Sequence, residues 1–143
     1  MKIISDKVYS DMFFIGALWN LAIGLGCLTL FRLSMRLLYG AKAVTNNIVA
    51  TLPLRFFYGS VAIFGWGYYM VSRDLKKNRG IVWMGILAKL IIFVTFIYYY
   101  LKKNIKIIPV LLGFGDFIFT ILFSLFLWET RNNVAKQIRK SSG

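Results

Sequence analysis

The chain has 143 residues, of which 59% are hydrophobic, 17% are aromatic and only 16% are charged. A soluble domain is about half apolar and a quarter charged, so this composition excludes an ordinary soluble protein, and the hydrophobicity excludes a disordered chain. The absence of histidine all but excludes zinc, haem and histidine-based acid–base chemistry, and the single cysteine excludes a disulfide framework. The sequence predicts neither a metal site nor a cofactor.

The net charge of +13 is distributed in a pattern typical of membrane proteins. The lysine and arginine residues lie almost entirely between and beside long apolar runs, where cations meet anionic lipid headgroups. A nucleic-acid-binding protein would instead carry a basic face on a soluble domain. The sequence therefore predicts membrane lipids, and no nucleic acid, as partners.

Four apolar runs are each long enough to cross a membrane as a helix. The first, 12–31, has twenty residues without a charge, and at 1.5 Å per residue it spans ~30 Å, the thickness of the hydrocarbon core. The others cover 54–71, 81–101 and 107–128. None shows the period-two alternation of a barrel strand. The sequence therefore predicts an all-α fold, a four-helix transmembrane bundle, with a single transmembrane domain over residues 1–143.

The connections between these runs differ in length. The segments 72–80 and 102–106 are short, so the helices that they join must pack antiparallel. The segment 32–52 is longer, and it begins with Arg32 and Arg36 four residues apart on one helical face. This segment is predicted either to extend the first helix or to lie along the membrane surface.

The distribution of cations predicts the orientation. Four spans place both termini on one side of the membrane, and that side carries ten cations against seven on the other, which favours cytoplasmic termini. The ten cations on the terminal side are Lys2, Lys7, Arg73, Lys76, Lys77, Arg79, Arg131, Lys136, Arg139 and Lys140, and the seven on the other side are Arg32, Arg36, Lys42, Arg55, Lys102, Lys103 and Lys106. The composition, rich in Ile, Phe and Lys, suits a bacterial inner membrane. Within the first group, the loop residues Arg73, Lys76, Lys77 and Arg79 are predicted to contact lipid headgroups.

Two charged residues lie inside the apolar runs, at membrane depth. A lone Lys or Asp near the bilayer centre costs ~2.5–3.5 kcal/mol, so it normally faces the bundle and has a partner. Counted from the terminal side, Lys89 lies ~12 Å and Asp116 ~18 Å into their helices, an offset that a lysine side chain can bridge. Small and polar residues recur at helical spacing through Asn20 on the first helix and through Asp116 and Thr120 on the fourth. The sequence predicts a polar centre of Asn20, Lys89, Asp116 and Thr120, which either fixes the helix pairing or binds a ligand.

Glycines flank this polar centre on three helices. If the helices pack closely, their backbones approach each other at these glycines and leave no space for water or a ligand. A binding site would instead leave an open pocket beside the polar residues. We expect an open pocket beside the polar centre. The flanking glycines are Gly16, Gly24, Gly85 and Gly113.

One stretch of the chain resembles a known group. The segment SRDLKKNRGIVWMGILAKL (72–90), followed by GFGD (113–116), resembles the second half of a small uncharacterised bacterial family of four-helix integral membrane proteins, and the chain is similar to the DoxX-like proteins in size and span count. The resemblance covers about half of the chain and implies the fold but no activity. The motifs of other small four-helix families are missing. The first run lacks the glutamate of small multidrug transporters, and Arg55 lacks the Glu and Asn that accompany it in the membrane glutathione enzymes.

The leading functional hypothesis is a non-enzymatic membrane protein that binds a lipid or amphiphile, or that serves as an accessory subunit beside a membrane protein partner or a second copy. The alternative is a small proton- or ion-coupled transporter that uses Asp116 and Lys89, although paired broken helices and internal symmetry are missing. An enzyme ranks third, because Asp116 is the sole base at depth and Ser124 lies two turns away on its helix. No catalytic residue is predicted.

Overall fold

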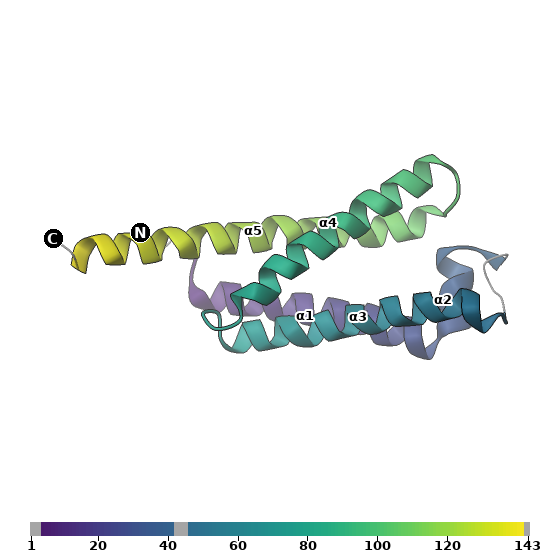
Figure 1. The fold of residues 1–143 in the computed structure, drawn as a ribbon, viewed down its shortest axis with the longest axis horizontal. Helices are drawn as coiled ribbons and strands as arrows, with labels where there is room; N and C mark the ends of the chain where they lie inside the picture. Colours follow the sequence, from purple (N-terminus) through teal and green to yellow (C-terminus); the bar gives the residue numbers. More distant parts are fainter. Residues whose placement is uncertain (1–3, 42–45, 142–143) are drawn as a thin grey trace.

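The computed structural model describes residues 4–41 and 46–141, with side chains described as far as Arg131. Within these residues the chain forms five helices and no strand (Figure 1). Four of the helices are long and apolar enough to cross a membrane, which confirms the predicted all-α, four-helix transmembrane fold. These are α1 (Asp6–Thr29), α3 (Ile48–Arg73), α4 (Arg79–Leu101) and α5 (Ile107–Ser141), and the short fifth helix is α2 (Phe31–Leu38).

Several helices extend beyond the apolar runs, because polar residues cap them outside the hydrophobic segment. The Ser5 side chain accepts a hydrogen bond from the backbone N–H of Val8 at 3.3 Å, and the Asn47 side chain accepts one from Val49 at 2.9 Å. At the other end of the chain, α5 has 35 residues and is therefore ~52 Å long, well beyond the ~30 Å of a hydrocarbon core. The last turns of α5 thus project from the membrane-spanning part.

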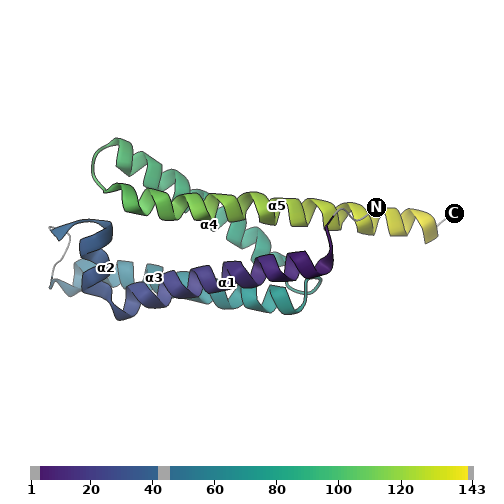
Figure 2. The same cartoon turned by 180° about the vertical axis from the view of Figure 1, so that it is seen from behind.

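The segment after the first span forms a separate helix. The backbone of Leu30 leaves the helical conformation (φ −102°, ψ 40°), and α2 then turns away from the axis of α1 (Figure 2). One face of α2 is buried, whereas Arg32 and Arg36 are exposed on the other. The guanidinium of Arg55 lies 4.1 Å from the ring centroid of Phe31, and it joins α2 to the start of α3.

The spanning helices form two hairpins. In the first, α1 and α3 approach so closely that a Cβ built on Gly24 would lie 2.6 Å from the backbone N of Ala62 and 2.8 Å from the carbonyl O of Tyr58. Likewise, a Cβ on Gly65 would lie 2.9 Å from the backbone N of Leu21. Small residues allow this approach of two backbones. The second hairpin consists of α4 and α5, joined by the short turn at 102–106.

An aromatic core joins the two hairpins near the chain termini. The rings of Phe13 and Phe123 stack with centroids 4.7 Å apart, and Tyr68 meets Phe123 edge-on at 4.9 Å. These side chains are almost completely buried. Beyond this core, α4 diverges from α3 as it runs toward the α4–α5 turn (Figure 1). In the middle of the bundle, α4 therefore lies farther from α3 than it does near the chain termini (Figure 1).

The exterior of the bundle is apolar. Large hydrophobic side chains such as Phe56, Ile63 and Leu101 are at least 70% exposed, and no more than a third of each spanning window is buried inside the chain. Soluble monomers rarely expose contiguous apolar surface of this extent. The outward-facing surface is therefore suited to lipid.

Candidate functional site

Lys89 lies in the middle of α4 with its side chain only 4% exposed. It is ten residues from the first residue of α4, or ~15 Å, which is half the thickness of a hydrocarbon core. Its ammonium donates a hydrogen bond to Oδ1 of Asn20 on α1 at 3.0 Å, and it forms an ion pair with Oδ1 of Asp116 on α5. The structure thus brings together three of the four residues of the predicted polar centre, each from a different helix.

Several groups around Lys89 offset part of the cost of burying its charge. Its Nζ lies 5.5 Å from the ring centroids of both Tyr68 and Phe119, close enough for cation–π attraction. An ammonium group has three N–H donors, and Asn20 and Asp116 accept two of them. The third donor is directed to no acceptor among the described residues. Lys89 and Asp116 together are electrically neutral, which is how two charges are tolerated at this depth.

The other two polar side chains of the predicted centre bond to the helix backbone. The Asn20 amide N–H donates to the carbonyl O of Val61 on α3 at 3.5 Å, so Asn20 links the polar centre to the fourth spanning helix. The Thr120 hydroxyl is buried, but it donates to the carbonyl O of Asp116, one turn earlier on α5, at 2.9 Å. Thr120 is therefore satisfied within its own helix, and its hydroxyl does not join Lys89.

A crevice of about 250 Å³ lies between α3 and α4, with Asn20, Lys89 and Asp116 among its lining residues. Two of the other lining residues, Ser60 on α3 and Ile91 on α4, are exposed, so the crevice opens to the exterior of the bundle. The rest of the lining is mainly apolar and aromatic: Phe57, Val61, Phe64, Tyr68, Ala88 and Ile92. The polar centre therefore meets an apolar opening that faces the lipid.

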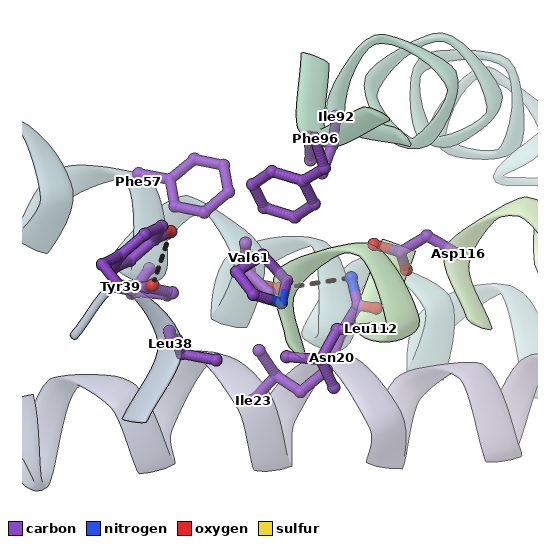
Figure 3. Close-up of a pocket in the computed structure, with 12 residues that line it drawn as sticks. Asn20, Ile23, Leu38, Tyr39, Phe57, Val61, Ile92, Phe96, Leu112 and Asp116 are labelled. Carbon is purple, nitrogen blue, oxygen red and sulfur yellow. Dashed lines mark hydrogen bonds between the residues drawn. The ribbon is translucent and has the colours of Figure 1, made fainter. Parts of the chain in front are cut away.

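A smaller inner cavity of about 40 Å³ shares Asn20 and Asp116 with the crevice. Figure 3 shows these two side chains at one end of the inner cavity and Tyr39 at the other, where its hydroxyl lies 3.3 Å from that of Tyr58. Burial raises the pKa of Tyr39, so its hydroxyl stays protonated at neutral pH. The volume exceeds the ~10–15 Å³ that one water molecule needs, and polar groups line both ends. Asp116 thus borders two cavities.

The glycines that flank the polar centre do not form these cavities, and the expected reason for a pocket was wrong. Gly24 is used in the contact with the α3 backbone, and Gly85 makes room for the Tyr68 hydroxyl. A Cβ on Gly16 would lie 3.3 Å from Phe119, and one on Gly113 would lie 3.3 Å from the rings of Phe93 and Phe96. Neither cavity is lined by any of the four. The crevice instead results from the divergence of α4 from α3.

The cations predicted to contact lipid headgroups fall into two groups. Arg79 is half-buried at the start of α4, and its Nη2 donates to the carbonyl O of Leu127 on α5 at 3.3 Å. The other three lie exposed at the end of α3 and in the turn that follows: Arg73, Lys76 and Lys77. The fold therefore separates one arginine, held against a neighbouring helix, from three cations that face outward.

Sequence reasoning missed a buried acidic side chain, Glu129. It is 6% exposed, and it accepts hydrogen bonds from the Tyr9 hydroxyl at 2.6 Å and from the backbone N–H of Ile4 at 3.2 Å. These bonds attach the beginning of α1 to α5 close to the chain termini. Glu129 directly follows the predicted fourth span, and Tyr9 precedes the first, so both fell in flanks where an exposed side chain is the usual expectation.

The three-residue polar centre and its two cavities form the candidate site. No protein-family model matches this chain, and no curated protein or solved structure matches it either. A function must therefore be argued from the geometry of the site itself.

Proposed function

We propose that this chain is a small, non-enzymatic integral membrane protein that binds an amphiphile in the crevice between α3 and α4. One observation carries the proposal: Asn20, Lys89 and Asp116 line an otherwise mostly apolar crevice of about 250 Å³ that opens toward the lipid. Ligand sites typically combine apolar walls with a few convergent polar groups. Because such pockets usually measure ~300–1,000 Å³, this crevice fits the head of an amphiphile and the first part of its chain.

The polar centre favours a head that is uncharged. Asp116 already balances the charge of Lys89, so an anionic head would bring an unbalanced negative charge to membrane depth. A hydroxyl, ester or amide group could instead accept the third N–H of the Lys89 ammonium, and a hydroxyl could donate to Asp116. We therefore infer that the ligand is a neutral-headed amphiphile.

The proposal can be tested by photo-crosslinking in phosphatidylcholine nanodiscs. The probe is a monoacylglycerol with a diazirine near its head, compared with a fatty acid of the same chain. We expect the neutral probe to label peptides of α3 and α4, and Ala88→Phe, which fills the crevice, to reduce labelling at least about tenfold, the equivalent of ~1.4 kcal/mol. Met84→Phe is the matched control, because Met84 lies one turn earlier on α4, is 62% exposed and lines neither cavity.

Two outcomes of this experiment would contradict the proposal. Equal labelling of the wild type and of Ala88→Phe would place the probe on the lipid-facing surface and not in the crevice. Stronger labelling by the fatty acid than by the monoacylglycerol would contradict the neutral head.

The second candidate is a small proton-coupled transporter, favoured by the position of Asp116 between the crevice and the inner cavity. Its carboxylate is 17% exposed, which is more than the 4% of Lys89. A transporter would move protons across a proteoliposome membrane when the monoacylglycerol is added, whereas a binding protein would not. A measurement with a pH-sensitive dye inside the vesicles therefore distinguishes the two candidates.

We further infer that the chain resides in a bacterial inner membrane with both termini in the cytoplasm. The beginning of α1, the α3–α4 turn and the end of α5 lie at the same end of the bundle (Figure 1). This end is the one with ten cations against seven, and the positive-inside rule assigns the richer side to the cytoplasm.

Cysteine labelling of intact cells tests this orientation. In a Cys27→Ala background, a membrane-impermeant maleimide is expected to label Lys103→Cys in the α4–α5 turn without lysis. It should label Lys76→Cys, in the α3–α4 turn, only after lysis, and both positions are exposed. The reverse pattern would show that the termini face outward.

A further inference from the structure

A third cavity, of about 230 Å³, lies between α4 and α5 at the end of the bundle that carries the termini. It is separate from the crevice and shares no lining residue with it. Two arginines and two tryptophans form much of its lining, with apolar side chains beside them. Its lining includes Arg79, Trp83, Ile86, Leu127, Trp128 and Arg131.

The depth of this third cavity corresponds to the headgroup level of a bilayer. Along α4, Arg79 lies ten residues or ~15 Å from Lys89, and along α5, Arg131 lies fifteen residues or ~22 Å from Asp116. The half-thickness of a hydrocarbon core is ~15 Å. With the ion pair near the middle of the membrane, both guanidinium groups therefore reach the lipid headgroups. Tryptophan side chains prefer the same level.

The third cavity presents positive charge without a compensating carboxylate. Arg79 is held in place by its hydrogen bond to the carbonyl O of Leu127 at 3.3 Å, and most of its five N–H donors remain for other acceptors. Arg131 extends from α5 into the same lining and is exposed. Among the described residues no Asp or Glu lines this cavity. Glu129 is close in sequence but bonds to Tyr9.

The chemistry of the lining points to an amphiphile with a phosphate group. Guanidinium groups bind phosphate oxygens with paired, charge-assisted hydrogen bonds. Ile86 and Leu127 are buried at the inner part of the cavity, whereas Trp83 and Trp128 are about 60% exposed at its outer part. A free phosphate ion would use the arginines but leave the apolar part uncovered.

We infer that this cavity binds an anionic phospholipid, with its phosphate between Arg79 and Arg131 and its glycerol and ester groups against the two tryptophans. Basic pockets between membrane helices are known sites for such headgroups. The inference does not depend on the crevice or on its ligand. It also differs from a general attraction of the exposed loop cations to the membrane, because it requires two particular arginines, one on α4 and one on α5, that line the same cavity.

Fluorescence quenching by brominated lipids tests this inference. The full-length protein is reconstituted in phosphatidylcholine vesicles that contain equal small fractions of either brominated phosphatidylglycerol or brominated phosphatidylcholine. We expect phosphatidylglycerol to quench the tryptophan emission more strongly, because it concentrates beside Trp83 and Trp128. The binding constant of phosphatidylglycerol relative to phosphatidylcholine should fall at least about fivefold for each arginine replaced, as in Arg79→Gln with Arg131→Gln, because each lost guanidinium removes charge-assisted hydrogen bonds to the phosphate.

The control removes the same charge from the neighbouring exposed cations. Arg73→Gln with Lys76→Gln should keep the preference for phosphatidylglycerol, because neither residue lines the third cavity. The single variant Arg131→Gln changes an exposed side chain with no intramolecular hydrogen bond among the described contacts, so its fivefold loss should occur with an unchanged circular dichroism spectrum.

Three results would overturn the inference. The first is the absence of any preference for phosphatidylglycerol in the wild type. The second is an equal loss in both double variants, which would indicate diffuse attraction to the surface. The third is removal of the preference by inorganic phosphate in the buffer, which would identify a site for the free ion.

Discussion

Replacement of Lys89 by methionine is expected to lower the free energy of unfolding by about 3–5 kcal/mol, because Asp116 then remains as an unpaired charge at membrane depth. Asp116→Leu should cost a similar amount, since the buried Lys89 ammonium loses its counter-ion. The double variant, Lys89→Met with Asp116→Leu, should recover much of the loss, because the two charges are removed together. Denaturant unfolding in detergent micelles, followed by circular dichroism, measures all three.

Recovery of the free energy of unfolding in the double variant would show that Lys89 and Asp116 are coupled. If this variant is at least as unstable as the sum of the two single variants, Lys89 and Asp116 do not act as a pair. Lys103→Met, an exposed change in the α4–α5 turn, controls for the loss of a lysine in general. Photo-crosslinking of the double variant then separates two roles. A stable protein that no longer takes up the monoacylglycerol uses its ion pair for binding as well as for helix pairing.

Gly24→Ala is expected to destabilise the first hairpin by about 1–3 kcal/mol, the usual cost of overpacking. The added methyl group would lie 2.6 Å from the backbone N of Ala62 and 2.8 Å from the carbonyl O of Tyr58. Neither atom belongs to a flexible side chain, so relief requires a shift of α3 against α1. The same unfolding assay measures the loss.

Gly26→Ala is the matched control for this prediction. Gly26 lies two residues later on α1, and a Cβ there has nothing within 4 Å. Alanine is favoured over glycine inside a helix by ~1 kcal/mol, so this change should be neutral or stabilising. Equal effects at the two positions would show that α1 and α3 do not approach each other through Gly24.

The four-helix fold could be predicted from the sequence because it depends on local quantities. The length of each apolar run and the rise of a helix determine how many spans the chain can form. The same rise, with a short turn between two helices, placed Lys89 and Asp116 within reach of each other. A lone charge at membrane depth is costly, which favours pairing of these two residues, and this prediction needs no knowledge of the remaining packing.

The cavities could not be predicted, because they depend on the angle at which the helices cross. That angle is determined by large side chains such as Tyr68 and Phe119, which fill the space beside Gly85 and Gly16. A glycine in a sequence indicates free space beside the backbone, but it does not indicate which neighbouring side chain fills that space. Glu129 was missed for a related reason: its burial requires Tyr9, which lies 120 residues away in the chain.

The outward opening of the crevice determines how the proposed ligand would arrive. Ser60 and Ile91, at this opening, are exposed on the lipid-facing exterior, so the ligand would enter by lateral diffusion within the bilayer. Occupancy would follow the mole fraction of the ligand in the membrane and not its aqueous concentration. Each added methylene favours transfer into lipid by about 0.8 kcal/mol, which raises the apparent affinity measured from water about fourfold. The affinity measured within the membrane would change little, because a longer tail stays in lipid whether or not the head is bound.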